Sequence, residues 1–485
     1  MALTIASTVA VAQSPADAGD DVSYYLNAAT QSPADANVRN ALGVAYLKRS
    51  QHEEAAAQFK VAVQLKSDFT EAWSNLGVAY SNLAIYDSAV VSFGRAININ
   101  AEFADAYNGL GFAYRNLQRT AEAVKSFQAV IALRPEDARA YYNLGETYLK
   151  SGRDSLAVVA LKTAVRYRKN FPAAYNFMGV AWMRLQKLVP AEDAFRDAVR
   201  YNPNFADAYN HLGIVCMQSR RYREAIQYYR EALRVNPEFA DAYAGTGLAY
   251  FKLKESTQAV EPYGQAIRRR PDDAELRRYL GEAFVSLRRY EDAATSYREA
   301  ARLQPDNAET QMLLGEVYFM LNEFGKSVLS HETAIRLNPK SARAYLGLGR
   351  AYGGWKRYSD ALAPVKKSLE LWPEYSEAHT YFGWLNQQLK NHAAAEAALR
   401  QAVTMNVSDS KARFGLAMFC MERSMDMRTN PIAADDYRRE AYSQLELLRS
   451  VDPDMYVRLK DEIAWMFRTR PYDFPQAGRE PTPIP

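Results

Sequence analysis

Six asparagines follow one another along the chain at intervals of 33 to 35 residues, and their side chains could bind a peptide. They are Asn40, Asn75, Asn108, Asn143, Asn176 and Asn210. Each side-chain amide carries an acceptor oxygen and two N–H donors. A column of such amides can hydrogen-bond the backbone of an extended peptide while discriminating little between its side chains. The spacing therefore predicts a row of hydrogen-bonding groups, presented by some repeating element.

Other residues capable of chemistry show no catalytic arrangement in the sequence. The five histidines share no spacing, and no cysteine–histidine pattern suits a metal. The sequence contains no motif of the nucleotide-binding, metalloprotease or serine-hydrolase type. Cys216 and Cys420 are expected to be buried thiols that do not pair with each other. We therefore expect no enzyme activity, no cofactor and no metal site.

The repeating element is marked by a glycine that returns every thirty-four residues. The eleven glycines are Gly43, Gly77, Gly111, Gly145, Gly179, Gly213, Gly247, Gly281, Gly315, Gly349 and Gly383. A period in this range means that each copy is one supersecondary unit, which buries its apolar face against its neighbours. The pattern predicts a solenoid.

The residues around each glycine predict two helices per copy. Aromatic residues four before and three after it, such as Tyr107 and Tyr114, share one stripe of a first helix with the glycine. A second helix follows, with a small residue and an aromatic four apart, such as Ala123 and Phe127. Pro135 and its equivalents cannot continue that helix. Because glycine inside a helix costs roughly 1 kcal/mol relative to alanine, its recurrence indicates close packing of the two helices.

These columns resemble the tetratricopeptide repeat, with its aromatic, Leu-Gly, Tyr, Ala, Phe, Ala and Pro at fixed offsets. The resemblance covers residues 36–408 as eleven units in phase. It implies an all-α fold, an α-α superhelix or solenoid of about eleven to twelve helix-turn-helix repeats with terminal capping helices. Departures at Arg277, Gln311, His331 and Val365 predict an irregular groove around copies eight to ten.

Outside the regular array we expect capping elements and a tail. Residues 20–35 are predicted to form an N-terminal capping helix. Residues 409–454 are predicted to form a degenerate twelfth repeat, with a loop insertion at 425–436. An apolar stripe predicts a C-terminal capping helix at 455–469. The proline-rich segment 470–485 is expected to be a tail, either disordered or lying along a groove.

The first nineteen residues bear on localisation. Residues 1–12 carry apolar and small side chains and end Ala-Val-Ala, which resembles the core and cleavage site of a signal peptide, although the basic start is missing. Residues 1–19 are therefore expected to be a signal-peptide remnant or a disordered terminus. This favours an exported, periplasmic location over a cytoplasmic one. No segment is apolar for long enough to span a membrane.

The resemblance also indicates where a ligand would bind. In the family, the first helix of each repeat lines the concave face. The resemblance therefore places the asparagines on that face, like the asparagine ladder of tetratricopeptide domains that hold peptide substrates. Further along, the same face carries aromatic and basic residues suited to anchoring a partner. The expected groove residues are Asn75, Asn108, Asn143, Asn176, Asn210, Arg278, Tyr279, Phe319, Tyr381 and Trp384. The alternative is that the asparagines only solvate the wall and that the aromatic residues only fill the core.

The sequence therefore predicts a non-catalytic protein-interaction scaffold that binds an extended peptide or a partner helix in its groove. The alternative is an accessory, substrate-recruiting subunit of an enzyme complex, for example in glycosyl transfer, with the catalytic domain on another chain. The net charge is +4 on 116 charged side chains, which does not favour nucleic acid as a partner. Acidic residues on the inner face, such as Glu71 and Asp207, would repel phosphate. The oligomeric state is left open.

Overall fold

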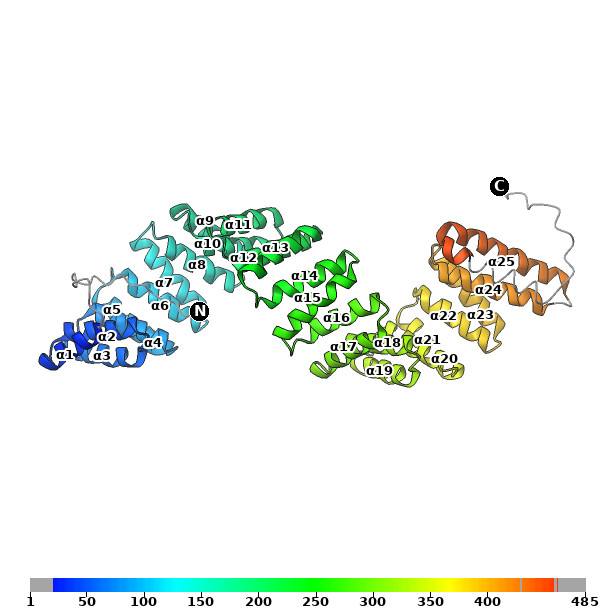
Figure 1. The fold of residues 1–485 in the computed structure, drawn as a ribbon, viewed down its shortest axis with the longest axis horizontal. Coiled ribbons are helices and arrows are strands. Elements are labelled where there is room, and N and C mark those ends of the chain that lie inside the picture. Colours follow the sequence, from blue (N-terminus) through cyan, green and yellow to red (C-terminus); the bar gives the residue numbers. More distant parts are fainter. Residues whose placement is uncertain (1–20, 428–429, 458–459, 461–485) are drawn as a thin grey trace. The chain divides into compact units, whose positions relative to one another are not determined.

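The computed structural model describes residues 21–427, 430–457 and 460, and these form α-helices in consecutive pairs without a β-strand (Figure 1). The chain divides into two compact units, Met1–Ala249 and Tyr250–Pro485, here called unit 1 and unit 2. The division falls inside one helix, α14 (Ala240–Lys252). The predicted all-α solenoid is confirmed. The termini, including residues 1–19 and 470–485, lie outside the described residues.

Each glycine column lies on a first helix, and each alanine column lies on a second helix. After α1 (Asp21–Gln31), the first helices up to α14 are α2 (Ala36–Lys48), α4 (Thr70–Asn82), α6 (Ala104–Asn116), α8 (Ala138–Lys150), α10 (Pro172–Arg184) and α12 (Ala206–Gln218). Their second helices are α3 (His52–Leu65), α5 (Tyr86–Ile99), α7 (Thr120–Leu133), α9 (Asp154–Tyr167), α11 (Leu188–Tyr201) and α13 (Tyr222–Val235).

Unit 2 continues the same alternation. Its first helices are α16 (Ala274–Ser286), α18 (Ala308–Met320), α20 (Ala342–Gly354), α22 (Ser376–Gln388) and α24 (Ser410–Asp426). The second helices are α15 (Ser256–Arg269), α17 (Tyr290–Leu303), α19 (Phe324–Leu337), α21 (Tyr358–Leu371), α23 (His392–Met405) and α25 (Pro431–Val451). Helices α18 and α20 have 13 residues and α19 and α21 have 14, as in other repeats, so the sequence departures in copies eight to ten leave the helices regular.

The recurring glycine lets an aromatic ring of the second helix lie directly against the first. A Cβ added at Gly77 would lie 2.7 Å from Cε1 of Phe93, and one added at Gly111 would lie 2.7 Å from Cε1 of Phe127. Both rings are fully buried. The steric reason for the glycine column is therefore ring packing within each helix pair.

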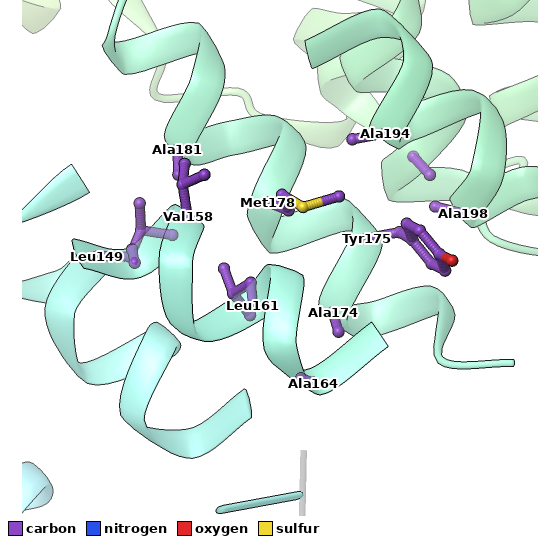
Figure 2. Close-up of a cluster of buried hydrophobic side chains, with 12 residues drawn as sticks. Leu149, Val158, Leu161, Ala164, Ala174, Tyr175, Met178, Ala181, Ala194 and Ala198 are labelled. Atoms are coloured by element: carbon purple, nitrogen blue, oxygen red, sulfur yellow. The ribbon is translucent and has the colours of Figure 1, made fainter. Parts of the chain in front are cut away.

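Between the pairs, the core continues from one repeat to the next. Figure 2 shows this for α8 to α11, where Leu149, Leu161 and Met178 lie among alanines. Alanines at these points let the helices approach closely while the larger side chains fill the remaining space. Each repeat buries its apolar surface against its neighbours, as expected of a solenoid.

The turn from first to second helix contains one residue in the left-handed region in most repeats. The non-glycine residues with φ between 57° and 61° are Ser50, Ala84, Gln118, Gln186, Arg220, Lys254, Arg288, Asn322, Lys356 and Lys390. In the fourth copy the equivalent residue is Gly152, with φ of 73°. The chain thus makes the same short turn with almost any residue, at some cost in backbone strain.

The ends of the array differ from the expectation at one place. Helix α1 packs Val22 and Ala29 against the first repeat, as a cap would. The expected loop at 425–436 is wrong, because α24 runs to Asp426 and α25 begins at Pro431, so that the extra residues lengthen both helices. Proline suits the first turn of α25, because its missing N–H would lack a helical partner there. The helix expected at 455–469 lies mostly outside the described residues.

Candidate functional site: the first-helix face

The face made by the first helices is the inner side of each unit. Successive first helices contact each other. For example, α4 contacts α6 in unit 1, and α18 contacts α20 in unit 2. No comparable contact joins successive second helices in the part of the chain that the structure describes. The first helices therefore lie closer together than the second helices, and each unit curves toward them.

Along this inner face, we use the word seam for the contact between two successive first helices. At a seam, the residue three before one glycine faces the residue two before the next glycine. Asn75 Nδ2 donates to Asn40 Oδ1 over 3.0 Å, and Asn143 Nδ2 donates to Asn108 Oδ1 over 2.9 Å. In both pairs the two residues are 35 apart in the chain. These amides hold neighbouring repeats together.

The other seams of unit 1 use the same two positions with different residues. Tyr142 packs on Phe177 with ring centroids 5.7 Å apart. Asn176 Oδ1 lies 2.9 Å from Nδ1 of His211. The residue 35 positions after Asn210 is Gly245, which has no side chain, and the buried Oδ1 of Asn210 has no hydrogen-bond partner in the described structure. Of the expected asparagines, Asn75, Asn176 and Asn210 are buried, whereas Asn108 and Asn143 are half-buried.

In unit 2, the structure places Arg278 and Tyr279 in a small polar cluster on α16. Arg278 forms ion pairs with Glu282 and, over 3.2 Å, with Glu275, and its guanidinium lies 4.5 Å from the Tyr279 ring centroid. The Tyr279 ring stacks on Tyr263. Burial raises the pKa of Glu282, although Arg278 opposes this. The arginine is thus held by its own helix.

A second cluster in unit 2 brings the other expected residues together around Gly353 and Gly354. Tyr381 and Trp384 of α22 pack on each other, with centroids 5.1 Å apart, and both lie against Gly353. Phe319 of α18 lies against Gly354 on the other side. A Cβ at either glycine would collide with these rings. The two glycines therefore allow aromatic rings from both neighbouring repeats to close over the end of α20.

Part of this aromatic cluster is open to solvent. Trp384 is 36% exposed, and Met320, next to Phe319 on α18, is 50% exposed. Phe319 and Tyr381 are half-buried, and burial raises the pKa of Tyr381. Aromatic and methionine side chains that are partly exposed on a concave face are typical anchors for a partner.

Charged residues on α18, α20 and α22 border the cluster. Arg350 pairs with Glu377 over 3.1 Å, and Arg343 lies 3.5 Å from Glu316. Burial raises the pKa of Glu316, although the two arginines oppose it. Arg350 also lies 5.4 Å from the ring centroid of Phe319. The charges alternate in sign, so that this part of the face has both donors and acceptors for a bound chain.

Sequence patterns did not reveal which side chains pair. His211, Arg343 and the seam partner Phe177 were not among the expected site residues. The available clue was the offset of 35 residues between paired amides, one more than the repeat period. Arg278 and Tyr279 lie on α16, away from Trp384 on α22, so the expected groove residues of unit 2 form two groups.

The described residues hold no cluster of three or more histidine, cysteine or acidic side chains that could bind a metal. Within the same residues, no helix is both long and apolar enough to cross a membrane.

Stacked helix pairs, with the first helices on the inner side of each unit, define a helical-repeat solenoid, a class of protein typical of protein-interaction scaffolds. The chain belongs to the tetratricopeptide repeat family. Models described as TPR repeat and Tetratricopeptide repeat match residues 45–83 and residues 70–103 and 377–409, respectively. A model of the Cilia and flagella-associated protein 70 C-terminal domain matches residues 101–312. A comparison with curated proteins found no match.

Several solved structures are similar to parts of the chain. The MamA protein is 27% identical, with 36% of this chain and 96% of that chain covered and a TM-score of 0.33. YrrB, described as a TPR protein with an unusual peptide-binding site, is 22% identical, with 39% and 96% covered and a TM-score of 0.34. The APC/C Cut9-Hcn1 hetero-tetramer is 13% identical, with 91% and 92% covered and a TM-score of 0.43.

Proposed function

We propose that this protein is a non-catalytic scaffold that binds an extended peptide or a helix of a partner protein on its first-helix face. The main apolar contact lies in unit 2, on α18, α20 and α22. The partly exposed pair Trp384 and Met320 carries this proposal, because Trp384 packs on Tyr381 in the aromatic cluster and Met320 directly follows Phe319, another member of that cluster, on α18. A partner side chain placed there would be desolvated without any rearrangement of the helices.

The bordering charges fit the same proposal. Arg350 and Glu377 are each about one-third exposed, so they can hydrogen-bond a bound chain while remaining paired. Tyr375 Oη lies 3.5 Å from Glu377, and its pKa is raised to about 12 by burial and by that carboxylate. An apolar centre with a polar rim is the usual arrangement of a protein-binding site.

We propose that the asparagines of unit 1 contribute less to ligand binding than a column of unpaired asparagines would. Four of them, Asn40, Asn75, Asn108 and Asn143, are engaged in pairs across seams. Replacing them together would remove hydrogen bonds between repeats as well as contacts to a ligand, so such a variant cannot separate the two roles. Single changes in the aromatic cluster of unit 2 are the sharper test.

The test compares Trp384→Ala with Trp355→Ala. Trp355 is 47% exposed but lies in the turn after α20, where Arg357 covers its ring. Partners are cross-linked and recovered with the full chain from the cells that express it, and quantified by mass spectrometry. We expect Trp384→Ala to reduce recovery roughly tenfold, as for a tryptophan anchor, and Trp355→Ala to leave it unchanged.

Thermal unfolding followed by circular dichroism verifies that both variants fold. Equal recovery by the wild type and the Trp384→Ala variant would contradict the proposed site. Equal loss with Trp355→Ala would mean that exposed tryptophans bind material without specificity, which would also contradict it.

A further inference from the structure

The second-helix side of unit 1 holds a cleft between α3 and α5. Both helices pack on α4, but in the described part of the chain second helices do not contact each other as first helices do, so part of α4 is left uncovered. The cleft has a volume of about 340 Å³. This is near the lower end of the range for ligand pockets, roughly 300–1,000 Å³. The cleft therefore suits one or two side chains of a partner rather than a large cofactor.

The floor of the cleft is apolar and is fixed by the core. It consists of Trp73, Leu76 and Tyr80 of α4. The two rings are half-buried and pack against clusters of buried residues that include members of α3 and α5, whereas Leu76 is buried. Trp73 Nε1 also donates to the Ser67 carbonyl over 2.9 Å, which holds the indole in place. An apolar group that covers this floor would be desolvated without any rearrangement of the helices.

One wall of the cleft carries an apolar side chain that is open to solvent. Val91 of α5 is 62% exposed, whereas Val63 of α3, on the other wall, is 6% exposed. The remaining α5 residues that line the cleft are Ser88 and Ser92, whose side chains are small. Ser92 Oγ already donates to the Ser88 carbonyl over 2.9 Å. A partner side chain in the cleft would therefore cover Val91 and the floor together.

A single positive charge stands at the edge of the cleft. Among the described residues that line it, Lys60 of α3 alone is charged. Its Nζ lies 5.5 Å from the centroid of the Tyr80 ring, which belongs to the floor. The residues three and four positions away from Lys60 on α3 are all uncharged, so no carboxylate stands where a pair within the helix would form. The charge complementary to this cleft is therefore negative.

From this arrangement we infer that the α3–α5 cleft binds a short segment of a partner protein, which places one apolar side chain on the floor and a neighbouring aspartate or glutamate beside Lys60. The floor and Val91 complement the apolar side chain, and the lysine complements the carboxylate. The cleft lies on the second-helix side of unit 1, whereas Trp384 lies on a first helix of unit 2. The inference therefore adds a second protein-binding site and does not rest on the proposed function.

Two other grooves of unit 1 each carry half of this arrangement and provide matched controls. Val159 of α9 occupies the repeat position of Val91 and is 64% exposed, but Gln128 of α7 stands where the lysine would be. Lys162 of α9 occupies the lysine position and is also exposed, but Asp193 of α11 takes the valine position of its groove. Aspartate at the valine position is thus compatible with the repeat.

The experiment titrates the isotope-labelled full chain with the capped tetrapeptide Gly-Leu-Glu-Gly. The chain has six tryptophans, so the indole N–H resonance of Trp73 can be followed by NMR and assigned by its loss in Trp73→Phe. We expect a saturable shift of this resonance at millimolar peptide. Val91→Asp removes the apolar wall and repels the carboxylate, and it should weaken binding roughly tenfold, whereas Lys60→Ala should weaken it roughly threefold. The matched changes Val159→Asp and Lys162→Ala should leave binding unchanged.

Two altered peptides complete the test. Glycine in place of leucine, or lysine in place of glutamate, should weaken binding, and equal binding of either peptide would overturn the inference. The absence of any shift with the original peptide would do the same.

The variants and the free protein supply the remaining outcomes. An equal loss of binding in Val159→Asp and Val91→Asp would contradict the site, because the change would then act through the fold. A Trp73 shift that depends on protein concentration without peptide would mean that a second copy of the chain occupies the cleft, which would also contradict it. Trp384→Ala should bind the tetrapeptide as the wild type does, so either site can fail while the other stands.

Discussion

At the scale of single residues, a buried amide stabilises the array only when its donors and acceptors have partners. Asn40 and Asn75 meet this condition for each other, and so do Asn108 and Asn143. His331 does not, because its Nδ1 is buried without a partner in the described structure. It occupies the place of the buried aromatic ring in the ninth repeat, where it is 1% exposed.

Replacing His331 with phenylalanine should remove a source of acid sensitivity. Burial, assisted by the charge of Arg350, lowers the His331 pKa from 6.5 to about 4. Between these values the unfolded chain binds the proton more readily, so stability falls as the pH falls. We expect the wild type to lose about 2 kcal/mol more than His331→Phe between pH 7 and pH 5.

The measurement is urea unfolding of both proteins at the two pH values. A phenylalanine fits this site, because Phe93 lies between Gly77 and Gly109 as His331 lies between Gly315 and Gly347. The same pH dependence in both proteins would show that His331 is not the titrating group.

The types of residue at the candidate site were predictable from the sequence, but their partners were not. A column of asparagines follows directly from the repeat period. Its pairing depends on which rotamers face each other across a seam, and this is set by packing that the sequence does not display. The closure of Tyr381 and Phe319 over Gly353 and Gly354 likewise depends on packing between repeats, which the residue types alone do not display.

At the scale of the helix, two kinds of glycine predict opposite outcomes. Gly77 on α4 lies against the buried ring of Phe93, whereas Gly94 on α5 has no atom within 4 Å of the place where a Cβ would stand. Gly77→Ala should destabilise the protein by about 1–3 kcal/mol through overpacking. Gly94→Ala should stabilise it by about 0.5–1 kcal/mol through helix propensity. Calorimetric melting of the two variants checks the signs, and a stabilising Gly77→Ala would refute the packing role.

The turns between first and second helices give a second pair of opposite changes. Ala84 has φ of 57°, which strains an alanine, whereas Gly152 adopts a φ of 73° in the equivalent turn at little cost. We expect Ala84→Gly to stabilise by roughly 0.5–1 kcal/mol and Gly152→Ala to destabilise by a similar amount. Thermal melting of both variants provides the comparison. Two changes of the same sign would mean that φ does not control these turns.

The helices themselves were almost fully predictable, because each one carries its own apolar stripe and a turn at a fixed offset. The exception is the region around 425–436, where the repeat pattern stops. Without that pattern, the choice between a loop and longer helices depends on local propensity and packing. The structure resolves it with Asn430, which caps α25 through the Ala433 N–H.

At the scale of the whole molecule, each unit carries one buried thiol. Burial raises the pKa of Cys216 in unit 1 to about 11 and that of Cys420 in unit 2 to about 12. Neither thiol should react with an alkylating reagent at neutral pH while its unit is folded. Because repeats interact mainly with their neighbours, each thiol reports on the unfolding of its own unit.

Pulsed alkylation in increasing urea, read by peptide mass spectrometry, tests this independence. In the Gly77→Ala variant, Cys216 should become reactive at lower urea than in the wild type, and Cys420 should react as before. A parallel shift of both thiols would show that the two units unfold as one.

The seams of unit 1 also limit how such an array can shorten or grow. The paired amides join the first copy to the second and the third to the fourth, so these seams are preserved only when repeats are lost or gained in pairs. Deleting residues 70–137 would bring Asn40 opposite Asn143 and keep a pair, whereas deleting residues 70–103 would leave Asn40 facing Gly109. A lineage that loses or duplicates repeats in twos would keep its seams intact.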